Sequence, residues 1–362
     1  MKKVITVIFL IIFLSACMHK ESGSIVSLFE NSKQLSHHVL KFQDSSDNLL
    51  SPAALEIYND LLIVLDVRAP RLFSAIDLKS GKLIKSWGNV GQGPGELVGV
   101  LDFYANYSNI GINAWDPILK KLNFCSYDSL QDSSNPQFEN LFGNIKNPDL
   151  IEMFYPNVLQ LSESTFLALG NNKENRFSLL DISANSIKDV GDYPQQDTRT
   201  EVIPMFRNQA YNGMIRFNDR VKKVVYMSRH SEMFEIFNVA AGKFELAYGS
   251  YTTIPEYEQS EDMSVSIDEY PNRIGRNVAL STSEEKIFIL YQEYKEKDMG
   301  NHLLNDAADI VLTFDWNGNP LQLYRLDVGV NHIRFDEKSN RLYAICNNPE
   351  PEIIYFDLTI RK

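Results

Sequence analysis

The sequence predicts an all-β fold, a six-bladed β-propeller built from four-stranded antiparallel blades. Three observations lead to this prediction: one strand–turn pattern recurs six times, each unit spans about 40–60 residues, and no long amphipathic helix pattern interrupts the series. Radial repetition of such units is one way in which an all-β chain protects its strand edges.

Unit one shows the pattern most clearly. An apolar strand at 61–66 is followed by a break at Ala69-Pro70, a second strand at 72–78, the turn 79–82 and a third strand at 83–87. Gly or Asn in such turns supplies the positive φ that tight hairpins need. The later units keep this order, at residues 111–126, 165–187, 224–248, 287–326 and 333–358.

The two ends of the chain predict how the ring closes. Unit six has strands at 333–335, 342–346 and 353–358 and then the chain stops, so its outermost strand is missing. Residues 37–42 form a spare strand upstream of unit one. Pairing of this N-terminal strand with the last blade would satisfy open backbone groups at the seam.

The first 16 residues read as a lipoprotein signal peptide. Lys2 and Lys3 precede an apolar stretch too short to remain as a membrane span, and Ser15-Ala16 directly precede Cys17. We therefore expect lipid on Cys17, a polar tether over 17–33 and a propeller over 34–362. The alternative is an ordinary secretory leader with an incidental Cys17. With lipid on Cys17 we expect the protein in the cell envelope, and the absence of Asp after Cys17 favours the outer membrane, facing the periplasm or the cell surface.

Composition limits the partners. The chain of 362 residues has a net charge of −12, which argues against nucleic acid because phosphates would repel it. The expected partners are the lipid bilayer, through Cys17, and a small ligand, a glycan or an envelope protein. Cys125 and Cys346 lie in apolar strand patterns and are predicted to be buried free thiols, with a disulfide as the alternative.

A glycine-rich stretch follows unit one, at Gly91, Gln92, Gly93, Pro94 and Gly95, and Glu96 comes next. It lacks the Lys-Ser or Lys-Thr ending of a phosphate loop, and no helix follows it. Together with Ser51-Pro52 and the Cys17 leader, this stretch resembles the bacterial six-bladed β-propeller lipoproteins called TolB-like. The resemblance covers essentially the whole mature chain and implies a fold and a location but no particular reaction.

Loop lengths predict which face binds a ligand. Because antiparallel strands alternate in direction, the first and third gaps of each blade lie on one face, and the second gap and the blade-to-blade link lie on the other. The first face, the short-turn face, carries only tight turns. The second, the long-loop face, carries the segments 88–96, 191–212, 249–277 and 292–309. Long loops on a rigid scaffold are where binding usually occurs, so we expect the ligand there.

The long loops also carry Tyr and Arg, which are favoured at recognition surfaces. The alternative is that these side chains only pack the loops onto the propeller. The candidate ligand-binding residues of the long loops are Arg207, Tyr211, Tyr270, Arg273 and Arg276. Glu96 and His332 are two further candidates, expected at the mouth of the central channel.

No catalytic or metal-binding motif stands out. His37 and His38 are adjacent on a strand, so their side chains point to opposite faces and cannot share a metal ion. Recurring Asp residues at strand ends are typical of turn and cap hydrogen bonds. The leading prediction is therefore a membrane-anchored binding protein with no catalysis, no cofactor and no metal. The alternative is a hydrolase or lyase with its active site at the mouth of the central channel.

Overall fold

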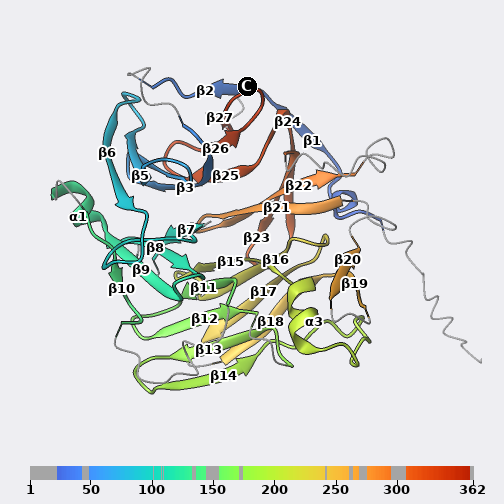
Figure 1. The fold of residues 1–362 in the computed structure, drawn as a ribbon. Coiled ribbons are helices and arrows are strands. Elements are labelled where there is room, and N and C mark those ends of the chain that lie inside the picture. The colour runs from blue at the N-terminus through green and yellow to red at the C-terminus, as the bar shows by residue number, and fades with distance from the viewer. Residues whose placement is uncertain are drawn as a thin grey trace, which may run out of the picture.

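The computed structural model of the chain is a six-bladed β-propeller, as predicted (Figure 1). It describes residues 23–42, 49–100, 102–106, 108, 110–132, 136–143, 155–170, 174–240, 243–260, 264–268, 275–294 and 307–358. No helix within these ranges is long and apolar enough to cross a membrane.

The blades follow one another around the ring in chain order. Blade one comprises β3 (Pro52–Tyr58), β4 (Leu61–Asp66), β5 (Arg71–Asp77) and β6 (Leu83–Asn89). Blade two comprises β7 (Phe103–Ala105), β8 (Gly111–Asp116), β9 (Lys121–Ser126) and β10 (Glu139–Asn140). Blade three comprises β11 (Asn157–Gln160), β12 (Thr165–Leu169), β13 (Phe177–Asp181) and β14 (Ser186–Val190).

The second half of the ring repeats this plan. Blade four comprises β15 (Gly213–Asn218), β16 (Lys223–Ser228), β17 (Phe234–Ala240) and β18 (Lys243–Ser250). Blade five comprises β21 (Gly275–Thr282), β22 (Lys286–Glu293), β23 (Ala308–Asp315) and β24 (Pro320–Val330). Blade six comprises β25 (His332–Asp336), β26 (Arg341–Cys346), β27 (Glu352–Asp357) and β2 (His37–Val39).

Burial explains why the second strand of a blade is the most apolar. β4 and β8 are buried along almost their whole length, because neighbouring blades cover both of their faces. Neighbouring first strands contact one another around the central axis: β3 with β7, β11 with β15, β15 with β21, β21 with β25 and β25 with β3. They therefore line the channel.

The predicted closure is confirmed. β2 pairs antiparallel with β27, with His37 opposite Phe356 and Val39 opposite Ile354, and supplies the fourth strand of the last blade. His37 and His38 point to different partners, as expected: the imidazole of His37 contacts Asp327, and that of His38 lies 3.7 Å from Asp357.

The structure moves the start of the propeller upstream of the predicted residue 34. Of the tether predicted over 17–33, the described part is packed on the ring. Ser24 leads into the 3₁₀-helix η1 (Ile25–Leu28), and Ile25 is fully buried against blades four and five. β1 (Ser32–Leu35) then adds a fifth, parallel strand beside β24. The sequence pattern missed this because isolated apolar residues among polar ones carry no clear period.

The buried carboxylate of Glu232 fixes this N-terminal segment. The Ser24 hydroxyl donates to Glu232 Oε1 at 2.7 Å, and the Tyr291 hydroxyl donates to the same oxygen at 2.5 Å. The Ile25 amide adds a longer contact of 3.3 Å. We call the interaction of Ser24 with Glu232 and Tyr291 the N-terminal latch.

The remaining helices and one hairpin lie in the loops. α1 (Tyr127–Asp132) follows β9, α3 (Pro204–Ala210) precedes β15, and β19 (Glu256–Gln259) pairs with β20 (Val265–Asp268) before β21. α3 lies beside the β19–β20 hairpin, so two long loops pack on each other (Figure 1).

The turn predictions hold where the structure describes them. Asn59, Gly81, Gly318 and Asn340 all have φ between 52° and 84°. The strand-end Asp residues cap turns or pair with side chains: Asp77 accepts from Ser80, and Asp357 accepts from Arg341. Cys125 and Cys346 are both buried and free.

Candidate functional site

One layer of the channel wall can be read from the strand register. In every blade, one residue of the innermost strand lies opposite the third residue of the second strand. These residues are Glu56, Tyr104, Leu159, Arg216, Ser281 and Arg334, opposite Ile63, Asn113, Leu167, Val225, Phe288 and Tyr343. Three of the six, Glu56, Arg216 and Arg334, are acidic or basic residues, which is unusual so close to the axis of a fold.

A cavity of about 580 Å³ opens directly above this layer. Its wall includes Glu56, Tyr104, Arg216 and Arg334. Its rim is formed by the first turns of the blades, for example at Asn59, Asn106, Asp219, Glu284 and Glu337. We call this cavity the channel pocket. It opens on the short-turn face, opposite to the long-loop face on which the ligand was predicted to bind.

Glu56 and Arg334 form an ion pair between neighbouring blades. Arg334 Nη2 lies 2.5 Å from Glu56 Oε1, and the carboxylate side chain is only 1% exposed. Backbone amides complete the coordination of Glu56: Ile57 donates to Oε1 at 2.9 Å and Ala105 donates to Oε2 at 3.1 Å. The pair is therefore held from blades one, two and six.

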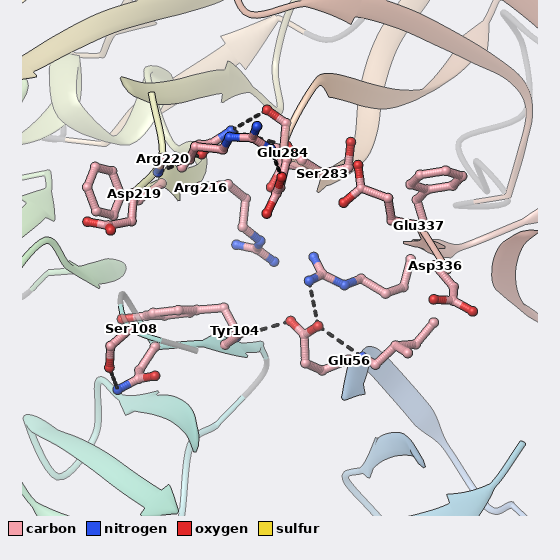
Figure 2. A pocket seen from close by; sticks show the side chains of 18 of the residues that line it. Glu56, Tyr104, Ser108, Arg216, Asp219, Arg220, Ser283, Glu284, Asp336 and Glu337 are labelled. Carbon is pink, nitrogen blue, oxygen red and sulfur yellow. Dashed lines mark hydrogen bonds and ion pairs between the residues drawn. The ribbon is translucent and has the colours of Figure 1, made fainter. Parts of the chain in front are cut away.

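Arg216 reaches past blade three to Asp102, which directly precedes β7. Its Nη2 donates to both Asp102 oxygens, at 3.0 and 2.8 Å, and its Nη1 donates to the carbonyl of Ile215 at 2.9 Å. Figure 2 shows Glu56 and Arg216 approaching the pocket from opposite sides. We call Glu56, Asp102, Arg216 and Arg334 the charged layer.

His332 lies beneath the charged layer. It is 6% exposed and begins β25, two residues before Arg334, so its side chain points to the same channel side of the strand. The pKa of His332 is lowered to about 4, chiefly by burial; Asp102 opposes the shift, and Arg216, Arg334 and Arg229 add to it. The imidazole is therefore neutral at pH 7.

The rim of the pocket carries ion pairs in solvent. Arg220 pairs with Glu284, and Lys338 Nζ lies 2.8 Å from Asp60. Asp336 accepts from the amides of Lys338 and Ser339 and caps its own turn. Such exposed pairs contribute little to stability, but they hold the short turns in place around the opening.

The predicted residue Arg207 lies in a packed cluster on the long-loop face. Its Nε is 3.3 Å from Asp197, whose other oxygen is 2.7 Å from Arg199 Nε. Tyr257 also donates to Asp197, at 2.8 Å. Burial alone would raise the pKa of Asp197, but the hydrogen bonds from Arg199 and Tyr257 hold that pKa below its usual range.

Aromatic rings seal this cluster. Tyr193 covers the Arg207 guanidinium at 3.8 Å, and Tyr257 covers that of Arg199 at 3.9 Å. The predicted residue Tyr211 is 1% exposed and stands 5.7 Å from the guanidinium of Arg176. We call this set the long-loop cluster: Arg176, Tyr193, Asp197, Arg199, Arg207, Tyr211, Glu235 and Tyr257.

Within the long-loop cluster, Arg176 forms a fully buried ion pair. Its Nη1 lies 2.7 Å from Glu235 Oε2, and both side chains are 1% exposed. Glu235 also accepts from the Tyr251 hydroxyl at 2.6 Å. Here Arg and Tyr pack the loops onto blades three and four, which was the alternative considered from the sequence.

The other predicted residues are dispersed. Arg276 Nε donates to Gln292 at 3.0 Å at the start of blade five. Glu96 folds back on its own loop, where it accepts from the Gly93 amide at 2.9 Å. A Cβ added at Gly91 would lie 2.0 Å from that carboxylate, so the glycine-rich stretch is a compact loop. Cys17, Tyr270 and Arg273 lie outside the described residues.

Among the predicted residues that the structure describes, His332 is thus the one that lies in the channel. The sequence did contain a signal for its neighbours, because residues 213–219 and 331–337 share the run Ile-Arg-Phe and place Arg216 and Arg334 in equivalent registers. Glu56 and Asp102 had no such signal. Among the described residues, no group of three His, Cys, Asp or Glu side chains is placed to hold a metal ion.

Solved structures share the fold. A putative exported protein from Bacteroides fragilis is 14% identical, with 92% of this chain and 96% of that chain covered and a TM-score of 0.53. A DUF4221-family protein from Bacteroides vulgatus is 11% identical, with coverages of 90% and 98% and a TM-score of 0.56. At these identities the likeness shows the fold alone.

Two sequence comparisons complete the picture. No curated protein matches the chain. The family described as TolB-like 6-blade propeller-like matches residues 29–338. This range includes every strand from β1 to β25 and leaves out η1 at the start and β26 and β27 at the end. With the blade count, the strand order and the N-terminal closure, this match shows that the chain belongs to the TolB-like six-bladed propeller family.

Proposed function

We propose that this protein is a cell-envelope binding protein whose small ligand enters the channel pocket from the short-turn face. The observation that carries the proposal is the charged layer facing an open cavity of about 580 Å³. That volume lies within the range of about 300–1,000 Å³ typical of small-molecule sites. It fits a small molecule or a short glycan better than a protein partner.

The chemistry of the charged layer favours binding over catalysis. Both carboxylates are engaged by arginines and by backbone amides, Glu56 with Arg334 and Asp102 with Arg216. A general acid or base needs a carboxyl group that is able to exchange a proton near neutral pH. Paired carboxylates of this kind instead hold arginine side chains in fixed positions for recognition.

Binding is tested by titrating purified protein with small metabolites and short glycans and following heat release and thermal unfolding. Arg334→Gln should weaken the binding of any ligand found by about tenfold or more. The matched control Arg276→Gln changes an arginine on the long-loop face and should leave binding intact. A ligand that is lost with Arg276→Gln or Arg207→Gln and kept with Arg334→Gln would return the site to the long-loop face.

The proposal also includes a lipid on Cys17 that anchors the protein in the outer membrane. The leader sequence supports it, and the exported relative in Bacteroides fragilis is consistent with an envelope location. Cys17→Ala should move the protein from the membrane fraction to the soluble fraction and stop the incorporation of labelled palmitate. Cys125→Ala, which changes a buried thiol, should do neither. Membrane retention of Cys17→Ala would remove the anchor from the proposal.

A further inference from the structure

The carboxylates of the charged layer have little hydrogen-bonding capacity left. Glu56 accepts from Arg334, Ile57 and Ala105. Asp102 accepts from Arg216 with both oxygens and from the Phe103 amide at 2.9 Å. A ligand that relied on donating hydrogen bonds would therefore find most of these acceptor sites taken.

Several nitrogen atoms at the pocket wall and directly beneath it lack partners by contrast. Among the described residues, Arg334 Nε and both ring nitrogens of His332 have no hydrogen-bond partner, although all three atoms are buried. Buried polar atoms are almost always satisfied, so unpaired ones need an explanation. His332 and Arg334 are two residues apart on β25, so their side chains lie on the same side of the strand, about 7 Å apart along it.

Charge at the floor points in the same direction. The charged and titratable groups that face His332 are Asp102, Arg216, Arg229 and Arg334, with Glu56 on the adjoining strand β3. The charges of three arginines thus act on the imidazole, while the two carboxylates are held in ion pairs. If the neutral imidazole took up a proton, it would add a further positive charge for a ligand.

We propose that the channel pocket binds the oxyanion end of a small organic acid, with one oxygen on the unpartnered Nε edge of Arg334 and the other directed toward His332, which lies beneath the pocket wall. The inference rests on the proposed function and names its ligand class. Arginine offers two parallel N–H groups to a carboxylate or phosphate group, and such charge-assisted bonds are stronger than neutral ones. The bound anion stabilises protonated His332, so the protein takes up a proton as the ligand binds. Affinity therefore increases as pH falls from 7 toward 5.

The test follows the imidazole of His332 by NMR in protein labelled with ¹⁵N-histidine, with His332→Gln used to assign its signal. The probes are glucuronate and glucose, which differ only in a carboxylate in place of a hydroxymethyl group, together with acetate and inorganic phosphate. Millimolar glucuronate, acetate or phosphate should shift the His332 signal and raise the pKa of the ring, and glucose should not.

Variants separate recognition from folding. Arg334→Gln should weaken glucuronate or acetate binding by about tenfold or more, as expected for the loss of a charged hydrogen bond. Arg334→Lys keeps the charge but loses the paired N–H geometry, so it should also weaken binding, and it serves if the Gln variant fails to fold. Arg276→Gln should bind as the unmodified protein does.

The outcomes are distinct. A His332 signal that moves with glucose as much as with glucuronate would overturn the oxyanion assignment and leave the pocket as a ligand site. A signal that none of the three anions moves would overturn the inference as well. If the wider metabolite and glycan titration also shows no binding that depends on Arg334, the proposed function fails with it.

Discussion

The long-loop cluster and the charged layer contain the same chemical groups in different surroundings. Each pairs an arginine with a buried carboxylate, Arg176 with Glu235 in the first and Arg334 with Glu56 in the second. In the cluster, tyrosine rings cover the guanidinium groups, so the ions hold loops together. In the charged layer the Arg334 side chain is 17% exposed and borders open volume. Richness in Tyr and Arg therefore marks recognition only where the groups remain accessible.

The largest expected effect is a difference in stability between two matched substitutions. Glu235→Gln leaves the Arg176 guanidinium without its counter-charge in a fully buried position, which costs about 3–5 kcal/mol. Glu56→Gln leaves Arg334 beside a cavity that water can enter, so we expect a cost of about 1–2 kcal/mol. Urea unfolding of both variants measures the two values. Equal losses would mean that the two arginines are equally sealed and would break the comparison.

The second effect concerns pH and sharpens the description of the channel floor. The pKa of His332 in the folded protein, about 4, lies below the unfolded value of 6.5. The unfolded chain therefore binds more protons between these values, and the contribution of His332 to stability is complete above pH 6.5 and lost as pH falls toward 4. The loss reaches about 3 kcal/mol.

Because other groups also titrate in this range, the measurement is the difference in unfolding free energy between the unmodified protein and His332→Gln. That difference should fall steadily from pH 7 to pH 4. A difference that does not change with pH would show that His332 is already solvated and would contradict the closed floor.

The smallest effect concerns the N-terminal latch. Ser24→Ala removes the hydrogen bond to Glu232 and should lower stability by about 1 kcal/mol. Proteolysis within residues 23–31 should also become faster, because the segment opens more often. Ser27→Ala, on the exposed side of η1, is the control and should change neither quantity. Equal cleavage of both variants would show that the latch does not hold the segment.

The fold was predictable because its signals are local and repeated. The strand at 37–42 was identified as the closing strand from a missing partner in unit six, and β2 fills that position. Turn residues such as Asn59 and Gly318 showed where hairpins form. The start of the propeller was missed because Ile25 is held by tertiary packing and by Glu232, more than 200 residues away in the sequence.

The site was less predictable, for a physical reason. Loop length predicts a ligand on the long-loop face, but the polar side chains of those loops bind one another, through Asp197 and the arginines around it. The charged layer depends on register across blades that are distant in the chain, such as Arg216 with Asp102. The matching Ile-Arg-Phe runs pointed to Arg216 and Arg334, but nothing in their local sequence identified their carboxylate partners.

The N-terminal latch also limits how the molecule is oriented at a surface. Glu232 lies in the second gap of blade four, between β16 and β17, so Ser24 is fixed on the long-loop side of the ring. Six residues lie between Cys17 and Ser24, so the connecting chain of seven residue steps spans at most about 25 Å. With lipid on Cys17, as proposed, the region of blades four and five that contacts Ser24 would be held close to the lipid headgroups of the membrane. The channel pocket, which opens on the opposite, short-turn face, would then face away from the bilayer and toward solutes in the surrounding solution.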